Sequence, residues 1–116
     1  MKLQIGKHNY DLHFGIKFIR TMDKRHGITF KQLPGMSFGM GLAPALQGLA
    51  VNDPAALADI ISAAASPRVG QDEVDDYLDS LNDKDYDALF KRVSQELEDS
   101  KRVNSFIKAL NKAGKN

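Results

Sequence analysis

Three side chains near the N-terminus, His8, Asp11 and His13, are of the types that bind metal ions or transfer protons. Imidazole nitrogens and carboxylate oxygens are ordinary zinc ligands, and histidine titrates close to neutral pH. Their spacing matches no established metal motif, and alternation places Asp11 and His13 on the polar face of a strand. We therefore predict solvated surface side chains here, and no catalytic residue, metal site or cofactor.

Two further patterns match known ligand-binding loops only in part. The acidic run 72–76 offers oxygen ligands for calcium, but the apolar residues in and after it recur at helical spacing. Gly39 and Gly41 are like a fragment of a phosphate-binding loop, yet the further glycine and the Lys-Ser/Thr ending are missing. We interpret the acidic run as the solvated face of a helix and the glycines as sites of tight backbone packing.

The composition is that of an ordinary globular domain, with 42% apolar and 27% charged residues among 116. The chain contains no cysteine, which excludes disulfides, thiolate nucleophiles and cysteine-based zinc sites. Its apolar runs are too short for a membrane-spanning helix or a signal-peptide core. We predict a single domain over residues 1–111, a flexible tail over 112–116, and a cytoplasmic location.

Charge is unevenly distributed, although the net charge is only +1. Lys and Arg counted against Asp and Glu give +5 for residues 1–32, −1 for 33–71, −8 for 72–100 and +5 for 101–116. This pattern argues against a uniformly basic nucleic-acid-binding surface. It favours acidic and basic faces that meet within one molecule or between copies, so we predict self-association that is sensitive to salt.

The elements that must position these residues are a hairpin and a series of helices. Apolar and polar residues alternate over 2–14 around a turn at 6–9. Helical periodicity and capping residues then predict helices ending at His26, covering 43–50, starting at Asp53-Pro54, covering 72–81 and starting at Asn82-Asp83. The apolar patch near 106–110 either continues the last helix or begins a separate one after Ser100. The predicted fold class is α+β, mostly α, with an N-terminal β-hairpin followed by four or five helices.

Large apolar side chains are dense in a segment that is also rich in glycine. These candidate partner-binding residues are Met36, Phe38, Met40, Leu42, Leu46 and Leu49. About half of them must belong to the core, while the rest are available to bind an apolar helix, because methionine and flexible glycine suit a surface that repacks. Phe106, Ile107 and Leu110 are candidates for oligomer contacts, and Ile16 fits neither face of its helix.

Several short pieces of sequence follow one another in a distinctive order. They are Tyr10-Asp11-Leu12-His13-Phe14-Gly15, Lys17-Phe18-Ile19-Arg20, Phe38-Gly39-Met40-Gly41-Leu42, Asp53-Pro54, Val74-Asp75-Asp76-Tyr77-Leu78-Asp79, and Tyr86-Asp87-Ala88-Leu89-Phe90 with Val93 and Leu97. This order resembles the tail assembly chaperones of long-tailed bacteriophages, especially those that infect Gram-positive bacteria. The resemblance covers about residues 2–100.

The resemblance implies a role in structural assembly and not in catalysis. Such chaperones coat the long, apolar tape measure protein, keep it soluble, and are displaced as tail tube subunits polymerise around it. The family commonly makes a longer product by programmed ribosomal frameshifting, and the added segment recruits the tail tube protein. This chain is expected to be the short product, to act in the bacterial host cytoplasm and to be absent from the mature virion.

A second hypothesis starts from the basic helix over 17–25. Lys17, Arg20 and Lys24 share one face, and phosphate groups bind such stripes. The chain would then be a small nucleic-acid-binding or regulatory protein. The same stripe is also the usual solvated side of an amphipathic helix, or a surface that contacts an acidic protein. No membrane partner is expected under either hypothesis.

Overall fold

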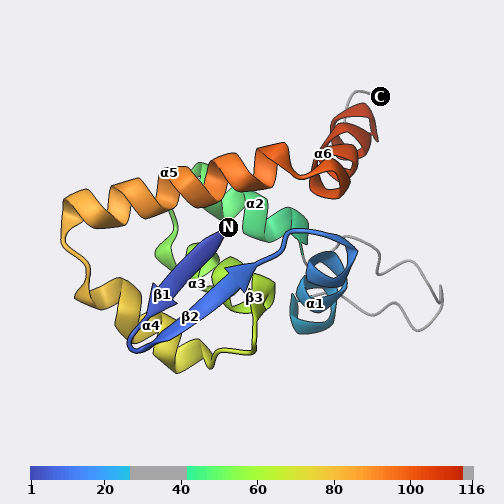
Figure 1. The fold of residues 1–116 in the computed structure, drawn as a ribbon. Coiled ribbons are helices and arrows are strands. Elements are labelled where there is room, and N and C mark those ends of the chain that lie inside the picture. Colours follow the sequence, from blue (N-terminus) through green and yellow to red (C-terminus); the bar gives the residue numbers. More distant parts are fainter. Residues whose placement is uncertain (27–41, 114–116) are drawn as a thin grey trace.

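The structure is a computed structural model that describes residues 1–26 and 42–113. Its elements in chain order are β1 (Lys2–Ile5), β2 (His8–Leu12), α1 (Ile16–His26), α2 (Leu42–Ala50), α3 (Pro54–Ala64), β3 (Ala65–Ser66), α4 (Gln71–Ser80), α5 (Asp83–Asp99) and α6 (Lys101–Ala113), as Figure 1 shows. The predicted α+β class with an N-terminal hairpin is confirmed. The described residues form six helices rather than four or five, because the chain after Ser100 forms a helix of its own.

The hairpin pairs β1 with β2 in antiparallel register, with Leu3 opposite Tyr10 and Ile5 opposite His8. The predicted turn at 6–9 is shorter than expected, because His8 already belongs to β2. Gly6 has a φ of +62°, a left-handed conformation that glycine adopts without steric cost, and this permits a tight two-residue connection. The alternation in the sequence is confirmed, since Leu3, Ile5, Tyr10 and Leu12 are buried.

A third strand extends this sheet. β3 pairs antiparallel with β2, with Ala65 opposite Leu12, and the described strands lie in the order β1-β2-β3. The amide of His13 continues the ladder by donating to the carbonyl oxygen of Ala64 at 3.0 Å. The sequence correctly predicts that the preceding helix ends near Ser66. It does not predict the strand, because two residues are too few to show an alternating pattern.

Side-chain caps start two of the helices where the sequence places them. The Asp53 carboxylate accepts a hydrogen bond from the amide of Ala55 at 2.9 Å, and Pro54 is the first residue of α3. The Asn82 side-chain oxygen accepts from the amide of Asp85 at 2.8 Å, at the start of α5. Both caps satisfy amide groups that have no partner within their helix.

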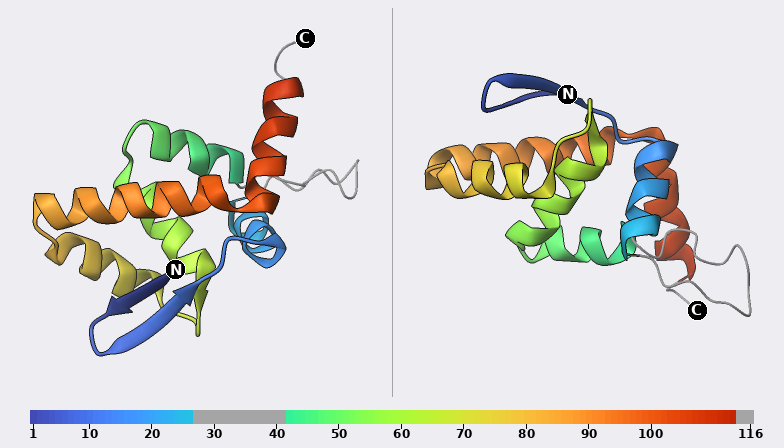
Figure 2. Two further views of the ribbon diagram at one scale, coloured as in Figure 1. Left: turned by 45° about the horizontal axis from the view of Figure 1, so that its top comes forward. Right: turned by 90° about the horizontal axis from the view of Figure 1, so that it is seen from below.

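The core is built around α3, which packs against α1, α2, α4 and β2. Leu57, Ile60 and Ile61 of this helix are completely buried. The hairpin lies on one side of the helices, and α5 runs along the molecule before the chain turns into α6 (Figures 1 and 2). α6 ends at Ala113, so the predicted boundary between domain and tail, at 111–112, lies inside a helix.

Candidate functional site

An apolar groove of about 740 Å³ lies between α2, α5 and α6. The large apolar side chains that line it are Leu46, Leu49, Phe90, Leu97 and Ile107. Gln47, Ser94 and Glu98 add polar groups to the lining. Three helices therefore contribute to one concave surface, which is the usual form of a site for an apolar ligand or helix.

The helices α2 and α5 each divide their apolar residues between the core and the groove. In α2, Leu42 is completely buried, whereas Leu46 is only half-buried and lines the groove. In α5, Val93 is completely buried, whereas the half-buried Phe90 lines the groove. The apolar stripe of each helix is thus wider than its core contact requires, and its edge remains accessible to a partner.

Ser100 sets the direction in which α6 leaves α5. Its amide donates to the carbonyl oxygens of Glu96 and Leu97, which ends α5. Its own carbonyl oxygen accepts from the amide of Asn104 at 2.8 Å, and its hydroxyl oxygen accepts from that of Val103 at 3.4 Å, which starts α6. Because the two helices join at one residue, α6 turns away from the axis of α5 and directs Ile107 to the groove (Figures 1 and 2).

The six predicted partner-binding residues fall into three groups. Leu46 lines the groove. Leu42 and Leu49 are 0% and 8% exposed, so both belong to the core, and Leu49 also reaches the groove wall. Met36, Phe38 and Met40 lie outside the residues that the structure describes.

The predicted oligomer-contact residues lie on α6. Phe106 and Ile107 are both half-buried, and Ile107 shares the groove with Leu46. The side chain of Leu110 lies outside the described part of the molecule. Phe90 is not among the partner-binding residues predicted from the sequence, although it lines the groove. The available signal was its position at the edge of the α5 stripe, four residues after Tyr86.

Tyr86 and Phe90 stack near the groove, with ring centroids 6.5 Å apart and ring planes at 28°. The Tyr86 hydroxyl is buried and has no hydrogen-bond partner among the described residues. Burial, followed by the negative charges of Asp53 and Asp87, raises the pKa of Tyr86 above its ordinary value. This phenol therefore stays protonated at neutral pH and presents aromatic surface rather than an acid or base.

A second concave surface, which we call the basic cleft, lies where α1 meets α3 and the chain after β3. It consists of two depressions, of about 670 and 360 Å³, that share Thr21, Arg25, Ser62 and Arg68. Lys24 lines the first depression, and Lys17 and His13 line the second. Arg25 donates to the hydroxyl oxygen of the buried Ser62 at 3.0 Å, which holds its guanidinium at the cleft.

The described residues contain no group of three His, Asp or Glu side chains placed to hold a metal ion. His8 and His13 are both exposed, and for His13 this is what the alternation in the sequence predicts. None of the helices in the described ranges is long and apolar enough to cross a membrane.

Comparison with known proteins gives one match. A family described as phage tail assembly chaperone protein, TAC, matches residues 2–112, which is nearly the whole chain and includes all of α6 except its last residue. No curated protein and no solved structure matches it.

Proposed function

Because the chain belongs to the phage tail assembly chaperone family, we propose that it binds an apolar helical segment of the tape measure protein in the groove between α2, α5 and α6. Membership means a chaperone role with protein partners in tail assembly, and the family is not a known enzyme family. The observation that carries the proposal is the convergence of Leu46, Phe90 and Ile107, three half-buried side chains from three helices.

The size of the groove suits a weak and reversible contact. Burial of apolar surface contributes about 25 cal/mol per Å², so a groove lined by a few large side chains gives a modest affinity. A long apolar tape measure offers many helical turns, and several copies of the chaperone bind it through the sum of weak contacts. Each copy is then displaced singly when tube subunits arrive.

Other parts of the proposal concern the setting of this contact. The chaperone acts in the bacterial host cytoplasm during tail morphogenesis and is absent from the mature virion. A longer, frameshifted form recruits the tail tube protein, and self-association brings several copies together on one tape measure. The frameshift has a direct test in the nucleotide sequence near the last codons, where a slippery heptamer of repeated bases is expected.

Nucleic-acid binding through α1 is the alternative function, and the cations of the basic cleft favour it. A purification experiment distinguishes the two functions. Co-expression with a phage tape measure protein yields a soluble complex if the chain is its chaperone. Salt-dependent retention of DNA by the chain alone would instead favour the alternative.

The groove itself is tested by Phe90→Ser combined with Ile107→Ser, co-expressed with the tape measure protein. We expect the wild-type chain to keep the tape measure in the soluble fraction and the groove variant to leave most of it in the pellet. Ile16→Ser is the matched control, because Ile16 is a 56% exposed apolar residue that does not line the groove. A folded groove variant that solubilises the tape measure as well as wild type contradicts the proposal.

A further inference from the structure

Two helices of this chain carry exposed stripes of opposite charge with matching spacing. The basic stripe of α1 is Lys17, Arg20 and Lys24, and the acidic stripe of α4 is Asp72, Asp75, Asp76 and Asp79. Within each stripe the charged residues recur at spacings of three or four, and the first and last of them are seven positions apart. Both therefore extend over about 10 Å, two helical turns.

The packing of each helix fixes the direction of its stripe. Phe18, Ile19 and Met22 bury the opposite side of α1. Val74 and Leu78 bury the opposite side of α4. Neither stripe can turn inward without exposing these apolar residues, so both remain on the surface.

The basic stripe borders a concave surface. Lys17 and Lys24 line the basic cleft together with Arg25 and Arg68, whereas the acidic stripe lies on the convex side of a helix. Asp23 of α1 and Asp59 of α3 are carboxylates on helices that border the cleft, but neither lines it. Asp59 accepts a hydrogen bond from Gln71 at 3.2 Å, and Asp23 also has an interaction of its own.

The two stripes do not meet within one molecule. α1 packs on α2 and α3, whereas α4 packs on α3 and β1. The N-terminal end of α4 adjoins the cleft through Gln71, and the helix then runs away from α1 (Figure 1). Within residues 1–26 and 42–109, no ion pair joins the stripes.

We propose that the acidic stripe of α4 docks into the basic cleft of a second copy of this chain. The contact itself does not depend on the proposed function. Only its role, to hold several copies on one tape measure, rests on that function. The occupant is a second copy because the chain itself supplies a convex stripe of the right charge and length.

The contact is heterologous, because it joins two different surfaces of the same chain. α1, which lines the cleft, and the C-terminal end of α4 lie toward opposite ends of the molecule in Figure 1, so each copy can bind one neighbour at each surface. Heterologous contacts produce rings or open helical arrays. Either arrangement would present the apolar grooves of successive copies in a regular series along the tape measure.

The test is sedimentation velocity at high protein concentration, in about 50 mM and about 500 mM NaCl. The screening length shortens as the salt concentration rises, so the attraction between the stripes weakens. We expect the wild-type chain to associate at low salt and to dissociate at high salt. Lys17→Glu with Lys24→Glu, and separately Asp75→Lys with Asp79→Lys, should each weaken association about tenfold or more at low salt. A wild-type chain that is monomeric at low salt overturns the proposal.

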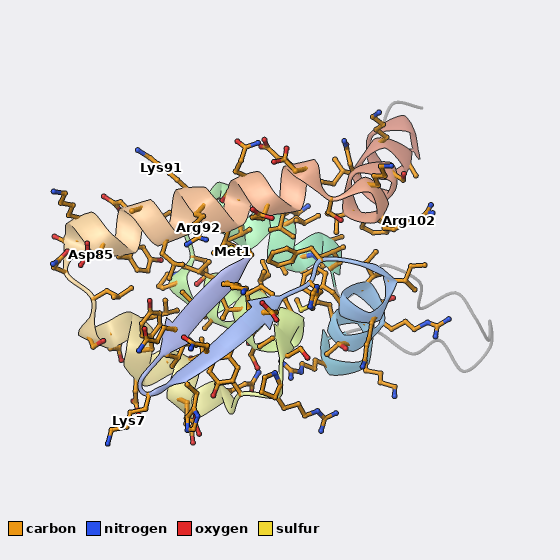
Figure 3. The ribbon with its side chains drawn as sticks, viewed as in Figure 1. Met1, Lys7, Asp85, Lys91, Arg92 and Arg102 are labelled. Carbon is orange, nitrogen blue, oxygen red and sulfur yellow. The ribbon has the colours of Figure 1, made fainter. Side chains whose placement is uncertain are left out.

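Mixing the two variants provides the decisive experiment. The first keeps a native acidic stripe and the second a native basic cleft, so an equimolar mixture should associate although each variant alone does not. Lys7→Glu with Lys91→Glu is the matched control, since both side chains are exposed, lie outside the cleft and point away from the body (Figure 3). A control that dissociates as much as the first variant, or a mixture that stays monomeric, overturns the proposal.

Failure of the groove and failure of this contact are distinguishable. The Lys17→Glu/Lys24→Glu variant should still bind a single apolar peptide from the tape measure, because the groove lies between other helices. Loss of peptide binding with intact self-association would refute the proposed function and leave this contact standing. Retention of DNA by the wild-type chain, with unchanged self-association in the variant, would overturn this contact in favour of a nucleic-acid surface.

Discussion

The hydroxyl group of Ser100 donates a hydrogen bond to the backbone carbonyl oxygen of Phe14, a residue 86 positions earlier in the chain. Phe14 lies between the hairpin and α1, so this bond ties the first part of the molecule to the junction of α5 and α6. The same hydroxyl oxygen accepts from the amide of Val103, and Val103 is completely buried. One side chain therefore holds α6 in the position that directs Ile107 to the groove.

Ser100→Ala should destabilise the folded protein by about 1–2 kcal/mol, since the variant loses a helix cap and a long-range hydrogen bond together. Ser105→Ala is the matched control, because the Ser105 hydroxyl donates only to the carbonyl oxygen of Lys101 within α6 and is exposed. Urea unfolding measures both. Equal stability of the Ser100→Ala variant and wild type would show that the junction does not depend on this hydroxyl.

The close approach of α2 to α3 gives a second prediction. A Cβ atom added at Gly48 would lie 2.6 Å from the Cβ atom of Ala56, so one helix must shift. Gly48→Ala should therefore cost about 1–3 kcal/mol, although alanine favours helices. At Gly15 an added Cβ atom meets nothing within 4 Å, which makes Gly15→Ala the control.

Ala56→Gly supplies the complementary test of the same contact. It removes the atom that the new Cβ meets, so the double variant should be more stable than the two single costs predict. The free energies of unfolding of the four proteins form a double-mutant cycle. Strictly additive values would mean that the two helices do not meet at this point.

Features that depend on a few neighbouring residues could be predicted from the sequence. Asp53 and Asn82 cap their helices through amides two or three residues away, and the sequence identifies both. Features that depend on distant residues could not. β3 exists because Ala65 meets Leu12, and the break at Ser100 is stabilised by Phe14, which is remote in the chain.

The candidate site follows the same rule. Periodicity shows which residues of α2 and α5 are apolar, but not how much of each stripe its neighbours cover. Leu46 and Phe90 therefore belong to one groove for a reason that only the packing of α2, α5 and α6 reveals. The chaperone role could be predicted, because the order of the short motifs is visible in the sequence and does not depend on how the helices pack.

Tyr86 predicts how stability depends on alkaline pH. Burial, Asp53 and Asp87 raise its pKa in the folded state above the ordinary value of 10.0. The folded protein thus holds this proton more tightly than the unfolded chain does. The resulting stabilisation is complete below pH 10.0 and is lost as the pH rises from there through the folded-state pKa.

Tyr86→Phe should be as stable as wild type at neutral pH, or slightly more stable, because it removes a buried hydroxyl that lacks a partner among the described residues. It should also lose less stability than wild type above pH 10.0. Thermal unfolding between neutral and alkaline pH measures both effects. Some alkaline loss will remain, because burial and Asp85 raise the pKa of Tyr77 as well.

The groove gives the last prediction, on Leu46→Ala and Ile107→Ala and their affinity for an apolar helical peptide of the tape measure protein. Both residues line the groove from different helices and are half-buried, so truncation removes contact surface while leaving the completely buried core intact. Each change should weaken binding about tenfold, equivalent to ~1.4 kcal/mol. Ile16→Ala, outside the groove, should leave the affinity unchanged. Fluorescence anisotropy of a labelled peptide measures these affinities, and urea unfolding confirms that each variant remains folded. If neither truncation changes the affinity, the tape measure binds elsewhere on the chaperone.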